Sequence, residues 1–237
     1  MRAVAFVSRK GGSGKSTIAT HLAIGAALRG RKVILADTDP QRSAFHVIRM
    51  RGDGEPRCEA TSGAKLFALK ASAERTGYDL LIVDTPAGND DVITQSLALC
   101  DQAIVVVRPS FLDFSVAART AEITRHLRKP ALAILNQAPP LRDGGENTVV
   151  KNALQALELM KLPTFPIVVR YRLAYQTALA RGLSVEEIPT AGGARTEMST
   201  LADMADRIWF PRPYEIPSAG EVVRTAPPRR HLLHAAE

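Results

Sequence analysis

The chain has 237 residues, of which 46% are apolar and 23% are charged, and its 31 lysines and arginines against 24 aspartates and glutamates give a net charge of +7. The apolar fraction excludes disorder over the whole length, and no apolar run approaches the roughly 18 residues that a membrane span needs. The basic surplus is compatible with an anionic partner such as nucleic acid, nucleotide or acidic lipid, and equally with solubility alone.

Short apolar runs recur along the chain and alternate with longer segments of helical periodicity. Most of the runs are continuously apolar, which is typical of strands buried on both faces of a parallel sheet. We predict strands at Ala3–Val7, Lys32–Ala36, Asp79–Val83, Ala103–Val107, Ala131–Leu135 and Pro166–Val169. We predict helices at Lys15–Leu28, Val92–Leu99, Phe114–Leu127, Val149–Leu159 and Glu197–Trp209. The alternation predicts an α/β fold in three layers, with a mostly parallel sheet flanked by helices.

Two segments fall outside this alternation. Residues Arg49–Arg57 form a polar, glycine-rich stretch that we predict to be a loop, and the chain from Pro211 onward is rich in proline. We therefore predict one domain over residues 1–210 and an extended or disordered tail over 211–237. The tail lacks the apolar spacing of a membrane-binding helix, so no membrane partner is expected. Cys58 and Cys100 form no CxxC pair, which excludes a disulfide framework and indicates a reducing cytoplasm.

A glycine-rich segment with the sequence K-G-G-S-G-K-S-T separates the first predicted strand from the first predicted helix. Glycines let backbone amides approach a polyphosphate closely, and the positive end of the following helix attracts its charge. Lys15 is placed to bridge the β- and γ-phosphates, and the Ser16 hydroxyl is placed to ligate Mg²⁺. The predicted ATP-binding residues of this segment are Lys10, Gly11, Gly12, Ser13, Gly14, Lys15, Ser16 and Thr17.

This loop departs from the usual G-x-x-x-x-G-K-[ST] pattern. Arg9 stands at the first glycine position, and a second lysine, Lys10, precedes the glycines. Over Lys10–Thr17 the loop resembles that of the deviant P-loop ATPases of the ParA/MinD family, K-G-G-x-G-K-[ST]. The resemblance implies a P-loop NTPase fold, ATP and Mg²⁺ as cofactors, and a homodimer that sandwiches two ATP molecules. In that dimer Lys10 would reach the nucleotide of the other subunit; a solvated surface lysine is the alternative.

Two predicted strands end in carboxylates. Asp37 and Asp39 belong to D-T-D-P-Q, and Asp84 precedes T-P-A-G. Acidic residues at the carboxyl ends of parallel strands project toward the ligand crevice. The resemblance implies that Asp39 orients or deprotonates the attacking water, that Asp37 supports the water shell of the metal, and that Asp84 binds Mg²⁺ through water. The catalytic residues would then be Asp39 with Lys10 and Lys15, although Asp39 also suits a helix N-cap.

Two further residues complete the predicted nucleotide site. Asn136 follows the predicted strand Ala131–Leu135, and it resembles the asparagine with which the family reads adenine. Pro166 would lie on the other side of the base pocket. Both also fit as ordinary loop residues at strand ends.

The resemblance also implies what the ATPase acts on. Arg170, Arg172 and Arg195 resemble family residues that touch DNA phosphates, although solvated arginines are the alternative. We expect a slow, partner-stimulated switch that dimerises with ATP, binds DNA non-specifically and segregates or positions DNA or a protein cargo. Its partners would be a ParB-like or other stimulating protein and the nucleoid. The alternative is a ParA-like ATPase that positions an envelope or polymer-synthesis machine through a protein partner without binding DNA.

Overall fold

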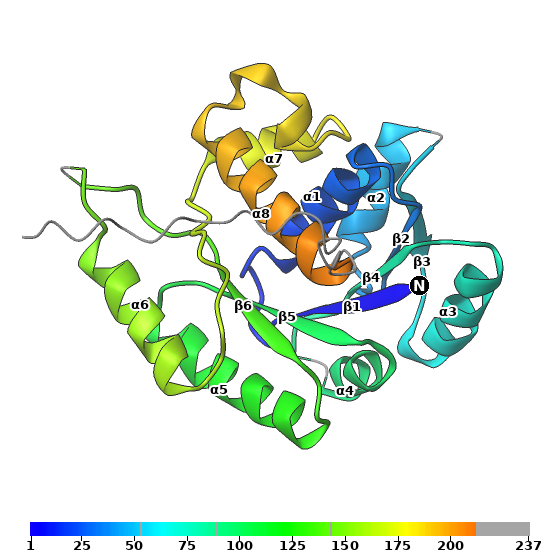
Figure 1. Ribbon diagram of the computed structural model, residues 1–237, viewed down its shortest axis with the longest axis horizontal. Helices are drawn as coiled ribbons and strands as arrows, with labels where there is room; N and C mark the ends of the chain where they lie inside the picture. Colours follow the sequence, from blue (N-terminus) through cyan, green and yellow to red (C-terminus); the bar gives the residue numbers. More distant parts are fainter. Residues whose placement is uncertain (53, 89, 143, 212–237) are drawn as a thin grey trace, which may run out of the picture.

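The computed structural model describes residues 1–52, 54–88, 90–142 and 144–211. Its strands are β1 (Arg2–Val7), β2 (Val33–Asp37), β3 (Arg57–Ala60), β4 (Leu80–Asp84), β5 (Gln102–Val107) and β6 (Ala131–Leu135). They form one sheet in which all neighbours pair in parallel, in the order β3-β2-β4-β1-β5-β6 (Figure 1). The predicted tail lies, from residue 212 onward, outside the described residues, so the division of the chain into domain and tail stays a prediction.

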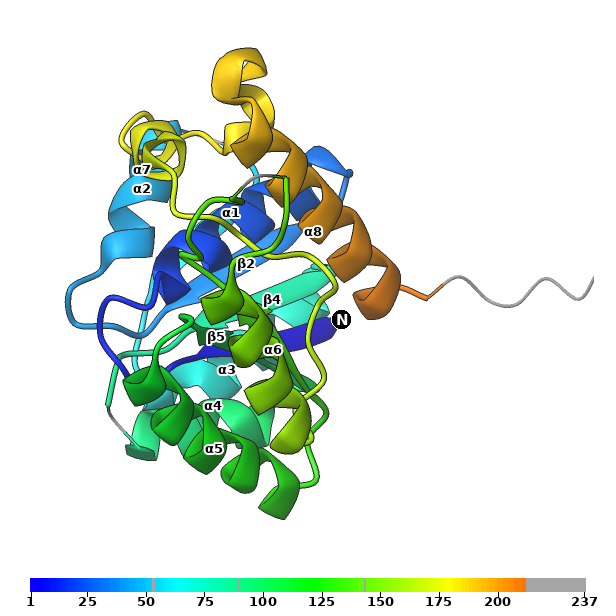
Figure 2. The ribbon, with the colours of Figure 1, turned by 90° about the vertical axis from the view of Figure 1, so that its left-hand side faces the viewer.

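Helices cover both faces of this sheet (Figure 1, Figure 2). One face carries α1 (Lys15–Leu28), α2 (Ser43–Arg51), α7 (Leu173–Leu179) and α8 (Gly193–Trp209). The other carries α3 (Leu66–Arg75), α4 (Asp90–Leu99), α5 (Phe111–His126) and α6 (Thr148–Leu159). Short 3-10 turns lie at η1 (Gly63–Lys65), η2 (Val185–Glu187) and η3 (Pro189–Ala191). The predicted three-layer α/β fold is confirmed, and no helix in the described ranges is long and apolar enough to cross a membrane.

The burial of the strands explains why this sequence forms this sheet. Successive side chains of a strand point to opposite faces. In β1, Val4 and Phe6 pack on the side of α1 and α8, whereas Ala3, Ala5 and Val7 pack on the side of α4 and α5. All five are excluded from solvent. A strand that is buried on both faces has to be apolar throughout, which is the pattern that the sequence displays.

The carboxyl ends of the parallel strands meet at one edge of the sheet. There β2 and β4 are in register, so that Asp37 is the cross-strand partner of Asp84. On its other side Asp84 pairs with Phe6, one residue before the end of β1. The loop that follows β1 therefore begins next to two carboxylates that are far apart in the sequence.

The prediction of a loop over Arg49–Arg57 is wrong at both ends. Residues 49–51 form the last turn of α2, and Arg57 begins β3. Ala44 and Ile48 lie four residues apart and are both buried, which anchors α2 on the core. β3 is an edge strand, where polar side chains are tolerated because backbone pairing with β2 holds the strand in place.

The predicted strand at Pro166–Val169 does not form. The segment runs alongside β6 without forming a continuous ladder with it. Isolated bridges pair Thr164 with Ala133 and Arg170 with Ala138. Pro166 has no backbone N–H to donate, so a ladder through this stretch lacks one of its hydrogen bonds. The described sheet consequently ends at β6.

Candidate functional site

The segment between β1 and α1 has the shape of an anion-binding loop. Gly12 and Gly14 have φ values of 74° and 85°, in the left-handed region that side chains disfavour. Gly14 is also the N-cap of α1, and no described side chain caps that end of the helix. The first amides of α1 are therefore left to an outside acceptor. Converging amides at the positive end of a helix are the arrangement that binds phosphate.

Lys15 and Asp84 form a buried ion pair next to this loop. Their side chains are 6% and 0% exposed, and Lys15 Nζ lies 3.1 Å from Oδ1 of Asp84. The other carboxylate oxygen, Oδ2, is buried and accepts no hydrogen bond from the described residues. Burial raises the pKa of Asp84, while Lys15 and the nearby Ser16 hydroxyl act against that rise. A buried carboxylate oxygen without a donor, close to a hydroxyl, suits a divalent cation that takes oxygen ligands.

Asp37 lies beside Asp84, but its own carboxylate is engaged by the backbone. Oδ1 accepts a hydrogen bond from the Asp39 amide and Oδ2 accepts one from the Phe45 amide, both at 3.0 Å. Burial raises the pKa of Asp37, and these two hydrogen bonds act against the rise. Asp39 is half-buried, and its Oδ1 accepts from the Gln41 amide at 2.9 Å. Asp37 thus holds the segment that leads into α2, and Asp39 lies in the turn within that segment.

Lys10 binds a different carboxylate, which the sequence analysis missed. Its Nζ lies 3.1 Å from Oδ2 of Asp113 in the first turn of α5. Arg108 donates to the same carboxylate at 3.0 and 3.2 Å, and the Ser110 hydroxyl donates at 2.5 Å. Burial by itself would raise the pKa of Asp113, but the hydrogen bonds from Arg108, Ser110 and Lys10 outweigh it and hold the pKa below its ordinary value. The signal in the sequence is the spacing of Ser110 and Asp113 at the start of a helix.

Arg9, which departs from the usual loop pattern, connects the loop to α4. Its guanidinium donates to Oδ2 of Asp90 at 2.7 Å, and Asp90 is the first residue of α4. Arg119 of α5 reaches the same carboxylate at 3.9 Å. The residue that breaks the pattern therefore joins the loop to the helix that follows β4.

Asn136 contacts the loop directly. Its Nδ2 donates to the carbonyl oxygen of Ser13 at 2.8 Å, and Nε2 of the next residue, Gln137, donates to the carbonyl oxygen of Gly12 at 3.0 Å. Pro166 is exposed and lies alongside β6, and no described contact joins it to the loop. The structure thus brings Asn136 to the loop and leaves Pro166 apart from it.

The three arginines predicted to contact DNA differ in their surroundings. Arg170 donates through both terminal nitrogens to Glu146, at 2.8 and 2.6 Å, and its side chain is 10% exposed. Arg172 pairs with Glu197 at 2.6 Å. Arg195 is exposed, and no acceptor for it is found within the described residues. Two of the three positive charges are therefore neutralised within the chain.

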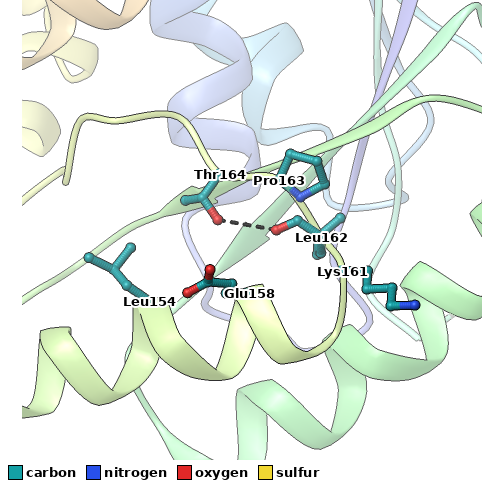
Figure 3. A pocket seen from close by; sticks show the side chains of 6 residues that line it. All are labelled: Leu154, Glu158, Lys161, Leu162, Pro163 and Thr164. Carbon is teal, nitrogen blue, oxygen red and sulfur yellow. Dashed lines mark hydrogen bonds between the residues drawn. The ribbon is translucent and has the colours of Figure 1, made fainter.

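A hollow of about 450 Å³ lies beside β6, on the side of α6. It is lined by Leu154, Glu158, Lys161, Leu162, Pro163 and Thr164 (Figure 3). Thr164 bridges to Ala133 in the middle of β6, whereas the loop is contacted by Asn136 after the end of that strand. The lining contains none of the predicted site residues, and the hollow is not part of the candidate site.

Comparisons with known proteins agree with this geometry. A family model described as the CobQ/CobB/MinD/ParA nucleotide binding domain matches residues 4–185. The chain belongs to this family. Its sequence is similar to that of the maintenance of carboxysome distribution protein A of Halothiobacillus neapolitanus, with 30% identity over 200 residues that cover 80% of this chain and 88% of the relative. The chromosome-partitioning ATPase Soj of Thermus thermophilus is 27% identical over 176 residues, which cover 61% of this chain and 71% of Soj.

Solved structures of similar fold extend over nearly the whole of this ParA/MinD-family chain. Apo McdA of Cyanthece has a TM-score of 0.72 at 17% identity and covers 86% of this chain and 99% of its own. The cell division ATPase MinD of Pyrococcus furiosus has a TM-score of 0.70 at 17% identity, with coverage of 87% and 99%. At this identity the likeness shows the fold. The predicted resemblance is thereby confirmed, and the protein is a nucleotide-binding ATPase of the ParA/MinD family.

Proposed function

We propose that this ATPase binds ATP with Mg²⁺ and uses it as a switch that positions a protein cargo in the cell through a partner protein. The observation that carries this proposal is the likeness to carboxysome distribution proteins, which reaches 80% of this chain in one relative and 88% in another. Both relatives are named for the maintenance of carboxysome distribution. This favours the alternative function that the sequence left open over the segregation of DNA.

The residues around the loop suit a magnesium nucleotide. The loop amides and the positive end of α1 would hold the phosphates, and Lys15 would meet them from its buried place beside Asp84. The Ser16 hydroxyl and the free Oδ2 of Asp84 would supply oxygen atoms around Mg²⁺, with Asp37 adjacent. Bound Mg²⁺ neutralises charge on the phosphates. ATP and Mg-ADP complexes occur among the structural neighbours, in a McdA variant of Cyanothece and in MinD of Pyrococcus horikoshii.

We propose that hydrolysis is slow in the single chain and faster in a homodimer. Asp39 lies in the turn before α2 and would orient the attacking water. Lys10 is 31% exposed and is held by Asp113, so it is not committed to the loop of its own chain. In the dimer it would leave Asp113 and stabilise charge on the phosphoryl group of the second subunit. The partner protein would act by favouring this arrangement.

DNA binding is the second candidate function. The likeness to Soj and the basic surplus support it. The ion pairs of Arg170 and Arg172 weigh against it, because a cation that already pairs with a carboxylate adds little to the release of counterions from DNA. If the protein associates with the nucleoid, Arg195 and other exposed cations, or the cargo partner, would make the contact.

Two measurements test the proposed function. The Asp39→Ala variant, loaded with ATP, should retain a partner protein from lysate that the ADP-loaded protein does not retain, and the partner should be a component of a protein assembly. A gel shift on non-specific duplex DNA at low salt, with and without ATP, should show no ATP-dependent complex. An ATP-dependent shift that vanishes with added salt would instead support the DNA-bound switch.

A further inference from the structure

Two adjacent amide side chains after β6 hold the phosphate loop from one side. Asn136 Nδ2 donates to the Ser13 carbonyl oxygen at 2.8 Å, and Gln137 Nε2 donates to the Gly12 carbonyl oxygen at 3.0 Å. Asn136 is 4% exposed. Gln137 has a φ of 52°, a left-handed conformation that is uncommon for residues other than glycine. Strain of this kind persists where the surrounding contacts require it, and here it allows two consecutive side chains to reach the loop together.

These two contacts determine where the loop amides point. A peptide unit is planar and trans, so its C=O and N–H groups point in opposite directions. The Gly12 carbonyl shares a peptide plane with the Ser13 amide, and the Ser13 carbonyl shares one with the Gly14 amide. When Asn136 and Gln137 hold the two carbonyls toward β6, the amides of Ser13 and Gly14 have to face away from β6. Both amides belong to the stretch that would wrap the phosphates.

Gly14 lacks a side chain at the place where Asn136 and Gln137 approach the loop. A Cβ atom at that position would lie 2.2 Å from Asn136 Nδ2 and 3.2 Å from Gln137 Nε2. Gly14 thus satisfies two requirements at once, because its φ of 85° also disfavours a side chain. A side chain at this position would therefore displace the amide of Asn136 from its contact with the loop.

We propose that Asn136 and Gln137 are positioning residues that orient two amides of the phosphate loop, and that they therefore act on the polyphosphate regardless of the base attached to it. This role differs from the reading of adenine that the family resemblance implies for Asn136. It goes beyond the proposed cargo and partner and does not depend on them.

Inorganic tripolyphosphate separates the two roles, because it has phosphates and no base. We expect Asn136→Ala to weaken binding of tripolyphosphate, ATP and GTP by the same factor of about ten, the loss of one buried hydrogen bond, measured by titration calorimetry with Mg²⁺. Gln137→Ala, at a half-exposed position, should weaken all three by about threefold. The matched control is Asn152→Ala on the exposed side of α6, which should change none of them.

Three results would overturn the proposal. One is a loss of ATP affinity in Asn136→Ala with unchanged tripolyphosphate affinity, which would make Asn136 a reader of the base. Another is that Asn136→Ala binds ATP more weakly but GTP as well as before, so that the whole loss of affinity is a loss of preference for ATP over GTP. The third is unchanged binding of all three ligands in Gln137→Ala. Melting curves without ligand identify any variant whose weaker binding reflects unfolding.

Discussion

Lys10 Nζ lies 3.1 Å from Oδ2 of Asp113, so the lysine that precedes the glycines is anchored to the chain that carries it. Arg108 and Ser110 donate to the same carboxylate. The pKa of Asp113 is below its ordinary value of 3.8 because these hydrogen bonds outweigh the effect of burial. The folded state thus favours the charged form. The resulting stability is fully present above pH 3.8 and is lost as the pH falls through the lower pKa of the folded state.

The first prediction concerns this carboxylate. Asp113→Asn should lower the free energy of unfolding by about 2 kcal/mol at neutral pH, because hydrogen bonds to a charged group are lost. The deficit should shrink as Asp113 becomes protonated in the wild-type protein. Urea denaturation of both proteins between about pH 7 and pH 2 measures it, because the deficit changes only below the unfolded-state pKa of 3.8. A deficit of constant size over that range would show that the carboxylate charge is not responsible.

The second prediction separates the two lysines of the loop. Lys10→Ala should keep the affinity for ATP within about threefold, because its side chain contacts Asp113 and not the buried Lys15–Asp84 pair. The same variant should fail to form the ATP-dependent dimer that we propose. Light scattering with ATP and Mg²⁺ measures the mass of the wild-type protein and of Lys10→Ala. The matched control is Lys151→Ala, which replaces an exposed lysine of α6. A Lys10→Ala protein that still doubles its mass with ATP would rule out the role of Lys10 in the dimer.

The third prediction follows from the burial of Lys15 and Asp84. Lys15→Ala should lower the free energy of unfolding by about 3 kcal/mol without nucleotide, because it leaves a buried carboxylate unpaired. The double variant Lys15→Ala with Asp84→Asn carries no such charge and should recover part of that loss. Denaturation curves of the single and double variants test this. If the double variant is no more stable than Lys15→Ala, the pair does not contribute as described.

The fourth prediction distinguishes structural arginines from exposed ones. Arg170→Ala should lower the free energy of unfolding by about 1 kcal/mol, because it removes a two-point ion pair with Glu146 at a mostly buried site. Arg195→Ala should change it by less than about 0.5 kcal/mol. Thermal melts of both variants provide the comparison. Equal stability losses would contradict the structural role of Arg170.

The fifth prediction concerns acid stability. His21 in α1 is fully buried, and its Nδ1 accepts from the Val185 amide at 3.4 Å. Burial lowers the pKa of His21 from 6.5 to about 4. As the pH falls from 6.5 toward 4, the unfolded chain takes up a proton that the folded chain does not, so folding should lose up to about 3 kcal/mol.

His21→Gln should remove this part of the pH dependence. The difference in unfolding free energy between about pH 7 and pH 4 should be smaller in the variant than in the wild-type protein. His126→Gln, at the exposed end of α5, should leave the difference unchanged. An identical pH dependence in His21→Gln and wild type would mean that another group causes the acid sensitivity.

The sequence by itself determined the layers of the fold and the place of the glycine-rich loop between β1 and α1. Strands buried on both faces have to be apolar throughout, so the predicted ranges of β1, β2, β4 and β5 agree with the structure to within a residue at each end, and that of β6 agrees at both. The loop is equally local, because its glycines and the helix that follows are contiguous. α1 accordingly begins at Lys15 and ends at Leu28, as predicted.

Only the tertiary structure decided which polar groups meet. Lys10 and Asp113 are 103 residues apart, Asn136 and Ser13 are 123 apart, and many other charges and amides occur between them. β3 could not be predicted because its pairing comes from the backbone of an edge strand, and Arg57 and Glu59 leave it without an apolar run. Likewise, the sequence does not indicate a partner for Arg170, and only the fold places Glu146 against it. Apolar burial leaves a periodic pattern along the chain, whereas the choice of a polar partner depends on which segments the folded sheet brings to the same edge.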